Sequence, residues 1–387
     1  MPEAAPPHSW SRQVVGTLLL RTSARLGLAW IGLLVVVSAL APLLANSHPL
    51  LLRVADQTSS PALAHLEPLD WLWFSGLLLA LLVAWLPLRA WLRLTLWLGG
   101  TALSALLAYT LVAPPLLTIH EQYRELEASG QVEWILRAPI PYSPKDYLRD
   151  YGDTGIEAPL AATEAGRYHW FGTEENGADV AARMIHAARI ALGIGFIATG
   201  IALLIGTLIG GLMGYFSGII DMIGMRVVEI FESIPTLFLL LTFVAFFGRS
   251  IYMMMIIIGI TSWSGYARYV RAEFLKLREQ EFVQAAVACG LPLHSILFRH
   301  ILPNGLAPLL VAASFGVASA ILAEATLSFL GLGLIDDPSW GQMLNQAVQS
   351  STFNWWLALF PGGAIFLTVF AYNLIGEALR DAVDPHA

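Results

Sequence analysis

Residues 190–214 read IALGIGFIATGIALLIGTLIGGLMG, an uninterrupted run without a charged side chain. A helix needs about 20 mostly apolar residues to cross roughly 30 Å of hydrocarbon. Seven further largely apolar runs lie near residues 27–46, 70–87, 92–112, 228–247, 251–269, 306–332 and 355–376. We therefore expect about eight transmembrane helices.

The composition agrees with a membrane protein. Hydrophobic residues make up 57% of the chain and charged residues 13%, with a mean hydropathy of +0.66, whereas soluble domains carry roughly a quarter charged residues. Only helices and closed barrels satisfy their backbone groups in lipid, and these runs lack the alternation of barrel strands. The fold class we expect is an all-α polytopic bundle. The length of the first run favours a retained span over a secretory signal.

Several classes of function are disfavoured by what the chain lacks. Its net charge is -7, and no block of like charge suggests a nucleic-acid-binding arm. The single cysteine, Cys289, excludes an intramolecular disulfide framework and a cysteine-based zinc cluster. The nine histidines include no H-E-x-x-H motif. We expect no metal site and no nucleic-acid partner.

The distribution of Lys and Arg predicts the orientation. Residues 1–26, 87–93 and 263–305 are basic, and with eight spans all three lie on the cytoplasmic side, as do both termini. Residues 113–185 hold six Lys or Arg against twelve Asp or Glu, a net charge of -6, so we place them outside. This outer segment is either a loop-dominated region or a small ordered subdomain.

The stretch EFVQAAVACGLPLHSILFRHILPN, Glu281–Asn304, is too polar to span a bilayer. Its small residues favour a helix, Gly290 suits a left-handed helix end, and Pro292 suits the first turn of a second helix that Pro303 limits. The pattern thus predicts a helix, a glycine turn and a helix on the cytoplasmic side. It is either a docking element for another protein or a hairpin lying on its own bundle or on anionic lipid.

This stretch resembles the EAA loop in permease subunits of ABC importers, whose pattern is Glu-Ala-Ala, three residues, Gly, nine residues, Ile, any residue and Leu-Pro. The chain departs from it with Gln284 at the glutamate position and His300 at the isoleucine position. Glu281, one turn earlier, stands where it can replace the missing carboxylate. Within a loop at 271–304, the resemblance implies that an ATPase docks on Glu281, Gln284, Ala285, Ala286, Gly290, Leu291, Pro292, Leu302 and Pro303.

Four other regions carry the same resemblance in the expected order. WFGTEENGADV at 170–180 is similar to the G-T-D-x-x-G-R-D-V segment of dipeptide, oligopeptide and nickel permeases. GYFSGIIDMIGMRVVEIFESIPTLFLLL, ILAEATLSFLGLGLIDDPSWGQML and WWLALFPGGAIFLTVFAYNLIGEALRDAVDP resemble the remaining signatures. The resemblance covers roughly residues 169–385. It implies a type I ABC importer permease core at 186–387. The apolar runs place about three spans before it in 1–112, where the family usually has one, so the pair near 70–87 and 92–112 looks like an insertion; the outer segment lies at 113–185.

The resemblance implies one half of a translocation pathway in the bacterial inner membrane. The implied partners are membrane lipid, a second permease subunit, two ATP-binding subunits and an extracytoplasmic substrate-binding protein. The chain has no G-x-x-x-x-G-K-[ST] loop, so ATP and Mg are expected on the partner chains, and this one is expected to be non-hydrolysing, without cofactor or catalytic residues. A peptide is favoured over nickel because the spans carry no His or Cys cluster.

Three carboxylates, Glu229, Glu232 and Glu324, lie in or beside predicted spans. Such groups are costly in lipid and usually face a partner or a cavity. They either bond within the bundle, with Arg226 as one partner, or contact the substrate or a gate. These carboxylates are also compatible with a second function, that of a proton-coupled secondary transporter. A membrane scaffold protein is a third alternative and would need only the docking loop. Within the ABC permeases, nickel or another small solute remains an alternative substrate.

Two further patterns predict packing and position. Glycines recur every fourth residue at Gly206, Gly210, Gly214 and Gly218, which favours a close helix crossing over a pore lining. Trp340, Trp355 and Trp356 are interpreted as anchors at the outer membrane interface.

Overall fold

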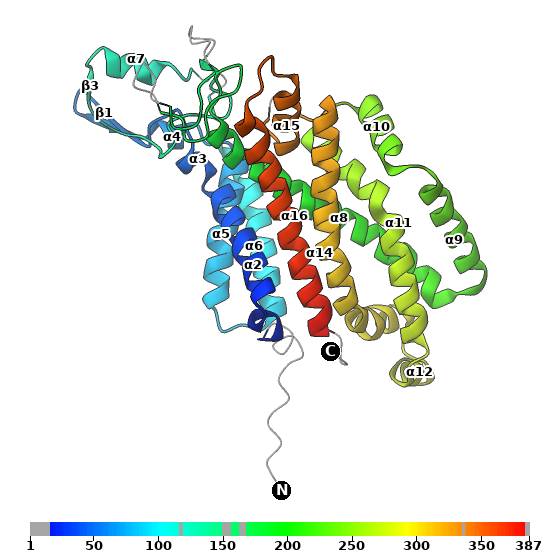
Figure 1. Ribbon diagram of the computed structural model, residues 1–387. Coiled ribbons are helices and arrows are strands. Elements are labelled where there is room, and N and C mark those ends of the chain that lie inside the picture. The colour runs from blue at the N-terminus through cyan, green and yellow to red at the C-terminus, as the bar shows by residue number, and fades with distance from the viewer. Residues whose placement is uncertain (1–15, 116–118, 149–155, 162–167, 335–336, 384–387) are drawn as a thin grey trace. The chain divides into compact units, whose positions relative to one another are not determined.

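Six helices in the described part of the chain (residues 16–115, 119–148, 156–161, 168–334 and 337–383) are long and apolar enough to cross a membrane in this computed structural model. Figure 1 shows them as α2 (Thr22–Ala39), α5 (Pro68–Trp85), α6 (Ala90–Leu111), α8 (Val180–Phe216), α14 (Leu302–Leu327), which continues into the π-helical η3 (Ser328–Leu332), and α16 (Trp355–Val383). The all-α membrane bundle is confirmed.

The predicted span at 228–247 is wrong as one straight helix. Helices α9 (Gly218–Ser233) and α10 (Thr236–Phe247) meet there at an 81° bend. Ile234 is extended at φ -89°, ψ 122°, because a residue before proline is disfavoured in the helical region and Pro235 has no N–H to donate. Counted as one broken span, the pair makes a seventh candidate. The predicted span at 251–269 lies within α11 (Ile251–Arg278), which is not among the six.

The chain folds as two units, with residues 1–31, 191–334 and 364–387 in the first and residues 32–190 and 335–363 in the second. In the first unit α11 packs against α9, α10 and α14. Of the four spaced glycines, Gly206, Gly210 and Gly214 belong to α8, and all three lie against α11. A Cβ at Gly206 would meet Tyr266, one at Gly210 would meet Ala267, and one at Gly214 would lie 2.6 Å from the carbonyl oxygen of Arg271. These glycines therefore serve packing.

The first and last long helices contact each other within the first unit. Gly27 of α2 faces the carbonyl oxygen of Ala371, where a Cβ would come within 2.7 Å. The Trp30 indole Nε1 donates a hydrogen bond to the Thr368 hydroxyl at 3.1 Å. The first apolar helix is thus packed as part of the bundle.

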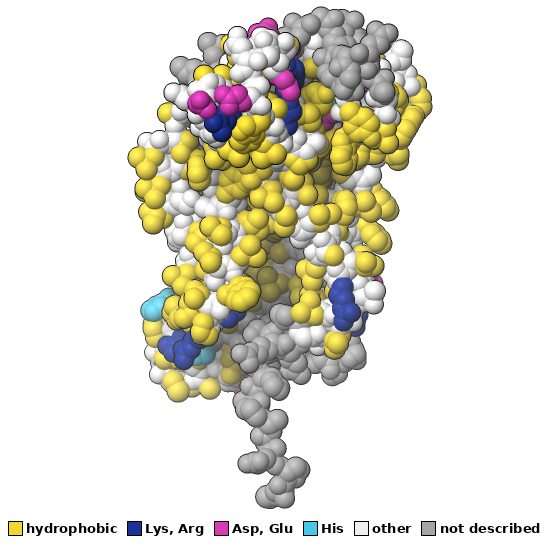
Figure 2. All heavy atoms as spheres, turned by 90° about the vertical axis from the view of Figure 1, so that its left-hand side faces the viewer, with side chains coloured by type: hydrophobic (Ala, Val, Ile, Leu, Met, Phe, Trp, Pro, Cys, Tyr) yellow, Lys and Arg dark blue, Asp and Glu magenta, His cyan; other side chains and the backbone are white. Residues whose placement is uncertain are grey.

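In the second unit α5 and α6 form a helical hairpin. Trp97 donates from Nε1 to the carbonyl oxygen of Gly76 at 2.9 Å, and the Ser104 hydroxyl bonds to that of Ser75 at 2.6 Å. The exposed side chains of the pair are mainly leucines and small residues. Figure 2 shows hydrophobic side chains across the middle of the face that includes this hairpin, as expected for contact with lipid.

A three-stranded antiparallel sheet, which the sequence did not predict, lies in the second unit. Its order is β2 (Gln57–Ser59), β1 (Leu51–Val54) and β3 (Val132–Leu136). Leu52 pairs with Ser59 on one side and with Ile135 on the other. The segment at 113–185 therefore contains ordered structure, namely β3 and α7 (Gln122–Ala128).

The remaining described helices are short. They are α3 (Ala41–Leu44), α4 (Pro61–Ala64), α12 (Glu281–Ala288), α13 (Leu293–Ser295), the π-helical η2 (Ile296–Ile301) and α15 (Trp340–Gln349). The expected division of the chain into residues 1–112, 113–185 and 186–387 stays a prediction.

Candidate docking site and pathway residues

The polar stretch after α11 forms the predicted helix, glycine turn and helix. Helix α12 ends at Ala288, and Gly290 follows with φ +68°. The Gly290 amide donates to the carbonyl oxygen of Val287 at 2.9 Å, and the Leu291 amide donates to that of Ala286 at 3.2 Å. This pair of bonds is a Schellman motif, whose left-handed residue is usually glycine. The turn therefore fixes the direction in which α12 leaves the rest of the loop.

The predicted helix limit at Pro303 is wrong. Pro303 lies in the first turn of α14, and the chain passes into α14 directly from the π-helical η2. A proline within a continuous helical stretch removes one backbone hydrogen bond and commonly accompanies a local change of helix geometry, here the change from π-helical to α-helical turns. The second helix of the loop is thus continuous with a membrane-spanning helix.

One face of α12 is fastened to its own unit. Val283 and Ala286 are buried together with Phe274 of α11 and with Ile296 and Ile301 of η2. Ala286 thus packs inward, and Leu302 packs against the same cluster. Movement of α12 is consequently coupled to both α11 and the segment that leads into α14.

The opposite face of the loop is apolar and open. Ala285, Gly290 and Pro292 are exposed, and a Cβ at Gly290 would meet no atom within 4 Å. Large exposed side chains surround them: Phe282, Val287, Leu291, Leu293 and Phe298. Grouped apolar side chains of this kind mark interaction surfaces more often than ordinary surface. We call these eight residues the docking face.

Gln284 is exposed beside the docking face and has a specific local partner. Its side-chain Nε2 donates to the carbonyl oxygen of Glu279 at 3.2 Å. A glutamate carboxylate cannot donate this bond, so the departure from the EAA pattern changes the start of α12. Gln284 also lines a groove of about 460 Å³ between α12 and the end of α8, where Tyr215 and Phe216 lie. Glu281, at the start of α12, is exposed.

Two of the three candidate pathway carboxylates are paired with arginines. Glu229 accepts from Arg226 at 2.5 Å, as predicted, with both side chains exposed. Glu232 pairs with Arg268 of α11, a partner the sequence did not reveal because it lies on another helix. These pairs agree with bonding inside the bundle.

Glu324 has a different environment. It is 2% exposed on α14, and its Oε1 accepts from the Ser328 hydroxyl at 2.6 Å. The hydrogen bond from Ser328 compensates part of the cost of burying this carboxylate. A role for Glu229, Glu232 or Glu324 in the pathway stays a prediction.

The segment WFGTEENGADV builds the start of α8. The Asp179 carboxylate accepts from the Ala182 amide at 2.7 Å and from the fully buried His169 ring at 2.8 Å. Gly172 has φ +76°, and a Cβ there would lie 2.6 Å from the carbonyl oxygen of Glu157. The signature residues therefore hold a tight turn and cap a helix; His169 and Glu157 lie outside the motif and were missed.

Two of the three tryptophans interpreted as interfacial anchors are buried. Trp340 is 2% exposed and donates to the carbonyl oxygen of Met184 at 3.2 Å. Trp356 is 8% exposed and donates to that of Thr173 at 3.2 Å. The anchor interpretation is wrong for both, since their indoles fasten the starts of α15 and α16 to the start of α8 and the turn before it. Trp355 is exposed.

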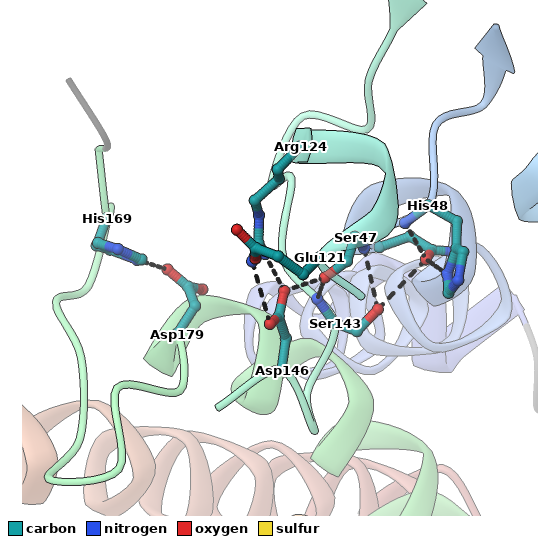
Figure 3. A network of polar contacts seen from close by, with 9 residues as sticks. Ser47, His48, Glu121, Arg124, Ser143, Asp146, His169 and Asp179 are labelled. Atoms are coloured by element: carbon teal, nitrogen blue, oxygen red, sulfur yellow. Dashed lines mark hydrogen bonds and ion pairs between the residues drawn. The ribbon is translucent and has the colours of Figure 1, made fainter. Parts of the chain in front are cut away.

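A second polar network ties segments far apart in the sequence. The buried Asp146 carboxylate accepts from Ser47 and Arg124, and the Ser143 amide donates to the Ser47 hydroxyl at 2.7 Å (Figure 3). Arg124 also pairs with Glu121 at 2.7 Å. This network joins the loop after α3 to α7 and to the residues before α8.

The histidines of this region predict a pH dependence. His48 stacks on His65, with ring centroids 3.9 Å apart, and meets His120 edge-on at 5.6 Å. Burial, and then the charges of His65 and His120, lower the pKa of His48 from 6.5 to about 3. Below pH 6.5 the His48 side chain therefore binds a proton in the unfolded chain but not in the folded chain. The free energy of unfolding consequently falls as the pH drops from 6.5 towards 3.

We expect the melting temperature of the full chain in detergent to fall more between pH 7.5 and pH 5.0 than that of His48→Phe. Phenylalanine keeps a ring against His65 but does not titrate. Equal losses in the two proteins would show that His48 does not carry the effect.

A polytopic helical membrane bundle with this loop between α11 and α14 is the arrangement expected of a membrane transport subunit. The chain belongs to the family described as "Binding-protein-dependent transport system inner membrane component", whose model matches residues 206–387. The sequence resemblance is thereby confirmed. The chain is a multi-pass ABC importer permease of the inner membrane and works with a substrate-binding protein and an ATPase.

Individual relatives agree with the family. The oligopeptide transport system permease protein OppC of Haemophilus influenzae is 41% identical over 247 residues, which cover 64% of this chain and 79% of that protein. The dipeptide transport system permease protein DppC of Alkalihalophilus pseudofirmus is 43% identical over 245 residues, covering 63% and 80%. Among solved structures, the inward-facing MetNI methionine ABC transporter is 17% identical, covers 52% of this chain and 96% of its own, and has a TM-score of 0.44.

Proposed function

We propose that this chain is the non-hydrolysing permease subunit of a peptide importer and forms half of its translocation pathway. The observation that carries the proposal is the docking face, an open apolar surface on α12 and on the residues that follow it, where the other side of α12 is packed on α11 and η2. Peptide as the substrate class rests on the relatives, which are named as oligopeptide and dipeptide permeases.

The proposed assembly contains a second permease subunit and two ATP-binding subunits that carry ATP and Mg. An extracytoplasmic binding protein delivers the substrate, and both termini of this chain lie in the cytoplasm. The ATPase docks on Glu281, Gln284, Ala285, Gly290, Leu291 and Pro292. Ala286 and Leu302, which pack inward, and the exposed Pro303 in the first turn of α14 transmit its movement.

The coupling follows from packing. ATP stabilises a closed pair of ATPase subunits, and a partner bound to the docking face moves α12 with it. Because Val283 and Ala286 pack on Phe274 and Ile296, that movement reaches α11 and, through η2, the start of α14. Packed elements shift between discrete arrangements rather than deforming continuously, so the bundle changes between inward and outward openings.

A proton-coupled secondary transporter would need carboxylates able to release and bind protons. Glu229 is paired with Arg226 of the same helix and Glu232 with Arg268 of α11, which supports a structural role for both carboxylates. This supports the ATP-driven mechanism over proton coupling.

The test is uptake of a labelled tripeptide into right-side-out membrane vesicles loaded with ATP. The vesicles contain the chain with the second permease subunit and the two ATP-binding subunits of its importer, and the binding protein is added outside. We expect uptake that requires ATP and survives a protonophore. Uptake that proceeds without ATP and collapses with the proton gradient would overturn the proposal.

A further inference from the structure

The first unit contains a cavity of about 250 Å³ between α8, α11 and α14. Four hydroxyl side chains line it, Thr199 from α8, Ser262 and Tyr266 from α11, and Ser319 from α14, and the other lining residues are alanine, glycine, isoleucine and phenylalanine. Ser262 and Ser319 are exposed, so the cavity opens to the surface of the chain. It is slightly smaller than the roughly 300–1,000 Å³ typical of small-molecule pockets, which suits part of a larger ligand.

Thr199 is the feature that points to a ligand. Its side chain lies in the cavity wall at 4% exposure, and its Oγ1 has no hydrogen-bond partner within the described ranges of the chain. Buried hydroxyls in native proteins are nearly always satisfied by the protein, by water or by a bound molecule. A threonine in a helix normally bonds back to the preceding turn, whereas this one leaves its oxygen available to the cavity.

Gly316 brings a second hydroxyl to the same place. A Cβ at Gly316 would overlap the Tyr266 hydroxyl oxygen and would lie 3.1 Å from the Thr199 Cγ2. The tyrosine hydroxyl and the threonine side chain therefore meet beside an α14 position that has no side chain. Any larger residue at Gly316 would displace the Tyr266 ring.

The chemistry of the wall selects the ligand. Among the described residues, no Asp, Glu, Lys, Arg or His lines the cavity, so a charged group entering it would lose water without gaining a counter-charge. Hydroxyls both donate and accept hydrogen bonds. A secondary amide offers the complementary acceptor and donor and carries no charge.

We propose that this hydroxyl-lined cavity is a subsite for main-chain amide groups of the transported peptide. It holds one stretch of backbone by Thr199 and Tyr266 and leaves the charged termini and side chains outside. Recognition there is independent of the side-chain charge of the peptide. This inference rests on the proposed peptide import for the identity of the ligand.

The test is a protection experiment on the full chain in phospholipid nanodiscs. Cys289→Ser removes the single native thiol, and Ser262→Cys places a new one at the cavity mouth. The rate of its modification by a methanethiosulfonate reagent is measured with and without the blocked tripeptide N-acetyl-Ala-Ala-Ala-amide. At ten times its dissociation constant, the peptide should lower the rate roughly elevenfold.

Three matched controls make the result specific. Ile260→Cys is exposed on the same helix but is not in the cavity wall, and its modification should be unaffected by the peptide. Blocked tripeptides with a central Lys or Glu should protect Ser262→Cys as well as the alanine peptide does. Thr199→Val, which keeps the shape but removes the hydroxyl, should raise the dissociation constant about tenfold, so that the same peptide concentration lowers the rate only about twofold.

The proposal is overturned if no peptide protects Ser262→Cys, if Ile260→Cys is protected equally, or if protection depends strongly on side-chain charge. If Thr199→Val fails to insert, Tyr266→Phe serves in its place, and unchanged protection in that variant also overturns the proposal. Neither ATP nor a partner subunit enters this experiment. Protection without ATP-driven uptake would therefore disprove the importer alone, and uptake without protection would disprove the subsite alone.

Discussion

Gly290→Asp should insert normally into the membrane and lose its ATPase on purification. The residue has φ +68° and open space around it, and aspartate is among the side chains that tolerate the left-handed conformation. The substitution therefore leaves the turn intact but places a charge between Val287 and Leu291 on the docking face. Burying an unpaired charge against a partner costs several kcal/mol, which corresponds to at least about a hundredfold loss of affinity.

The measurement is the amount of ATPase recovered with the tagged chain from detergent-solubilised membranes. Gly130→Asp is the matched control, because Gly130 has φ +69° and nothing within 4 Å of a Cβ but lies in the segment predicted to be outside. It should retain full ATPase recovery. Normal recovery with Gly290→Asp would disprove the docking site, and it would leave a scaffold or a secondary transporter as the better interpretation.

Arg189→Met should cause the largest loss of stability. The Arg189 guanidinium pairs with the Asp70 carboxylate and donates to the carbonyl oxygens of Ser38 and Ala39. It thereby joins α8, the start of α5 and the end of α2. Both charged side chains are about nine-tenths buried, and removing one partner of such a pair costs about 3–5 kcal/mol.

Thermal unfolding of the full chain in detergent measures this loss. Arg226→Met is the control, because the Arg226–Glu229 pair is exposed and such pairs contribute about 0–1 kcal/mol. Arg189→Met combined with Asp70→Asn should recover part of the stability, since asparagine can still accept the Glu67 amide bond that Asp70 accepts at 2.8 Å. Equal melting temperatures for Arg189→Met and Arg226→Met would show that the buried Arg189–Asp70 pair does not stabilise the fold more than an exposed pair does.

The sequence predicted features that depend on local chemistry. Gly290 ends α12 because a left-handed residue is needed there, and Gly206 and Gly214 pack closely because they have no side chain. Both effects can be recognised from residue type and spacing. The apolar runs likewise predicted the long helices.

What the sequence did not reveal depends on neighbours that are distant along the chain. Trp340 and Trp356 looked like interfacial anchors, because nothing local shows that a carbonyl oxygen in or just before α8 accepts from each indole. The partner of Glu232 lies on α11 for the same reason. Pro235 could be read from the sequence as a possible helix break. The apolar residues on both sides of it nevertheless suggested one continuous span, so the bend between α9 and α10 was not predicted.

Gln284 shows how the structure changes a question raised by the sequence. At the glutamate position of the EAA pattern it appeared as a lost charge. The structure adds that its amide donates to the carbonyl oxygen of Glu279, so the substitution exchanges an acceptor for a donor. The start of α12 is thus held by a bond that a glutamate cannot form.

The pairing of β1 with β3 has a consequence for the α5–α6 hairpin that lies between them in the sequence. Strand β1 precedes the α5–α6 hairpin and β3 follows it, and Leu52 is directly paired with Ile135. The two ends of the segment that contains α5 and α6 are therefore held side by side, whatever the length of that segment. Because the paired strands hold the two ends of the α5–α6 hairpin together, this pair of membrane helices can be inserted or deleted as one unit. The path of the chain from β3 to α8 would stay the same.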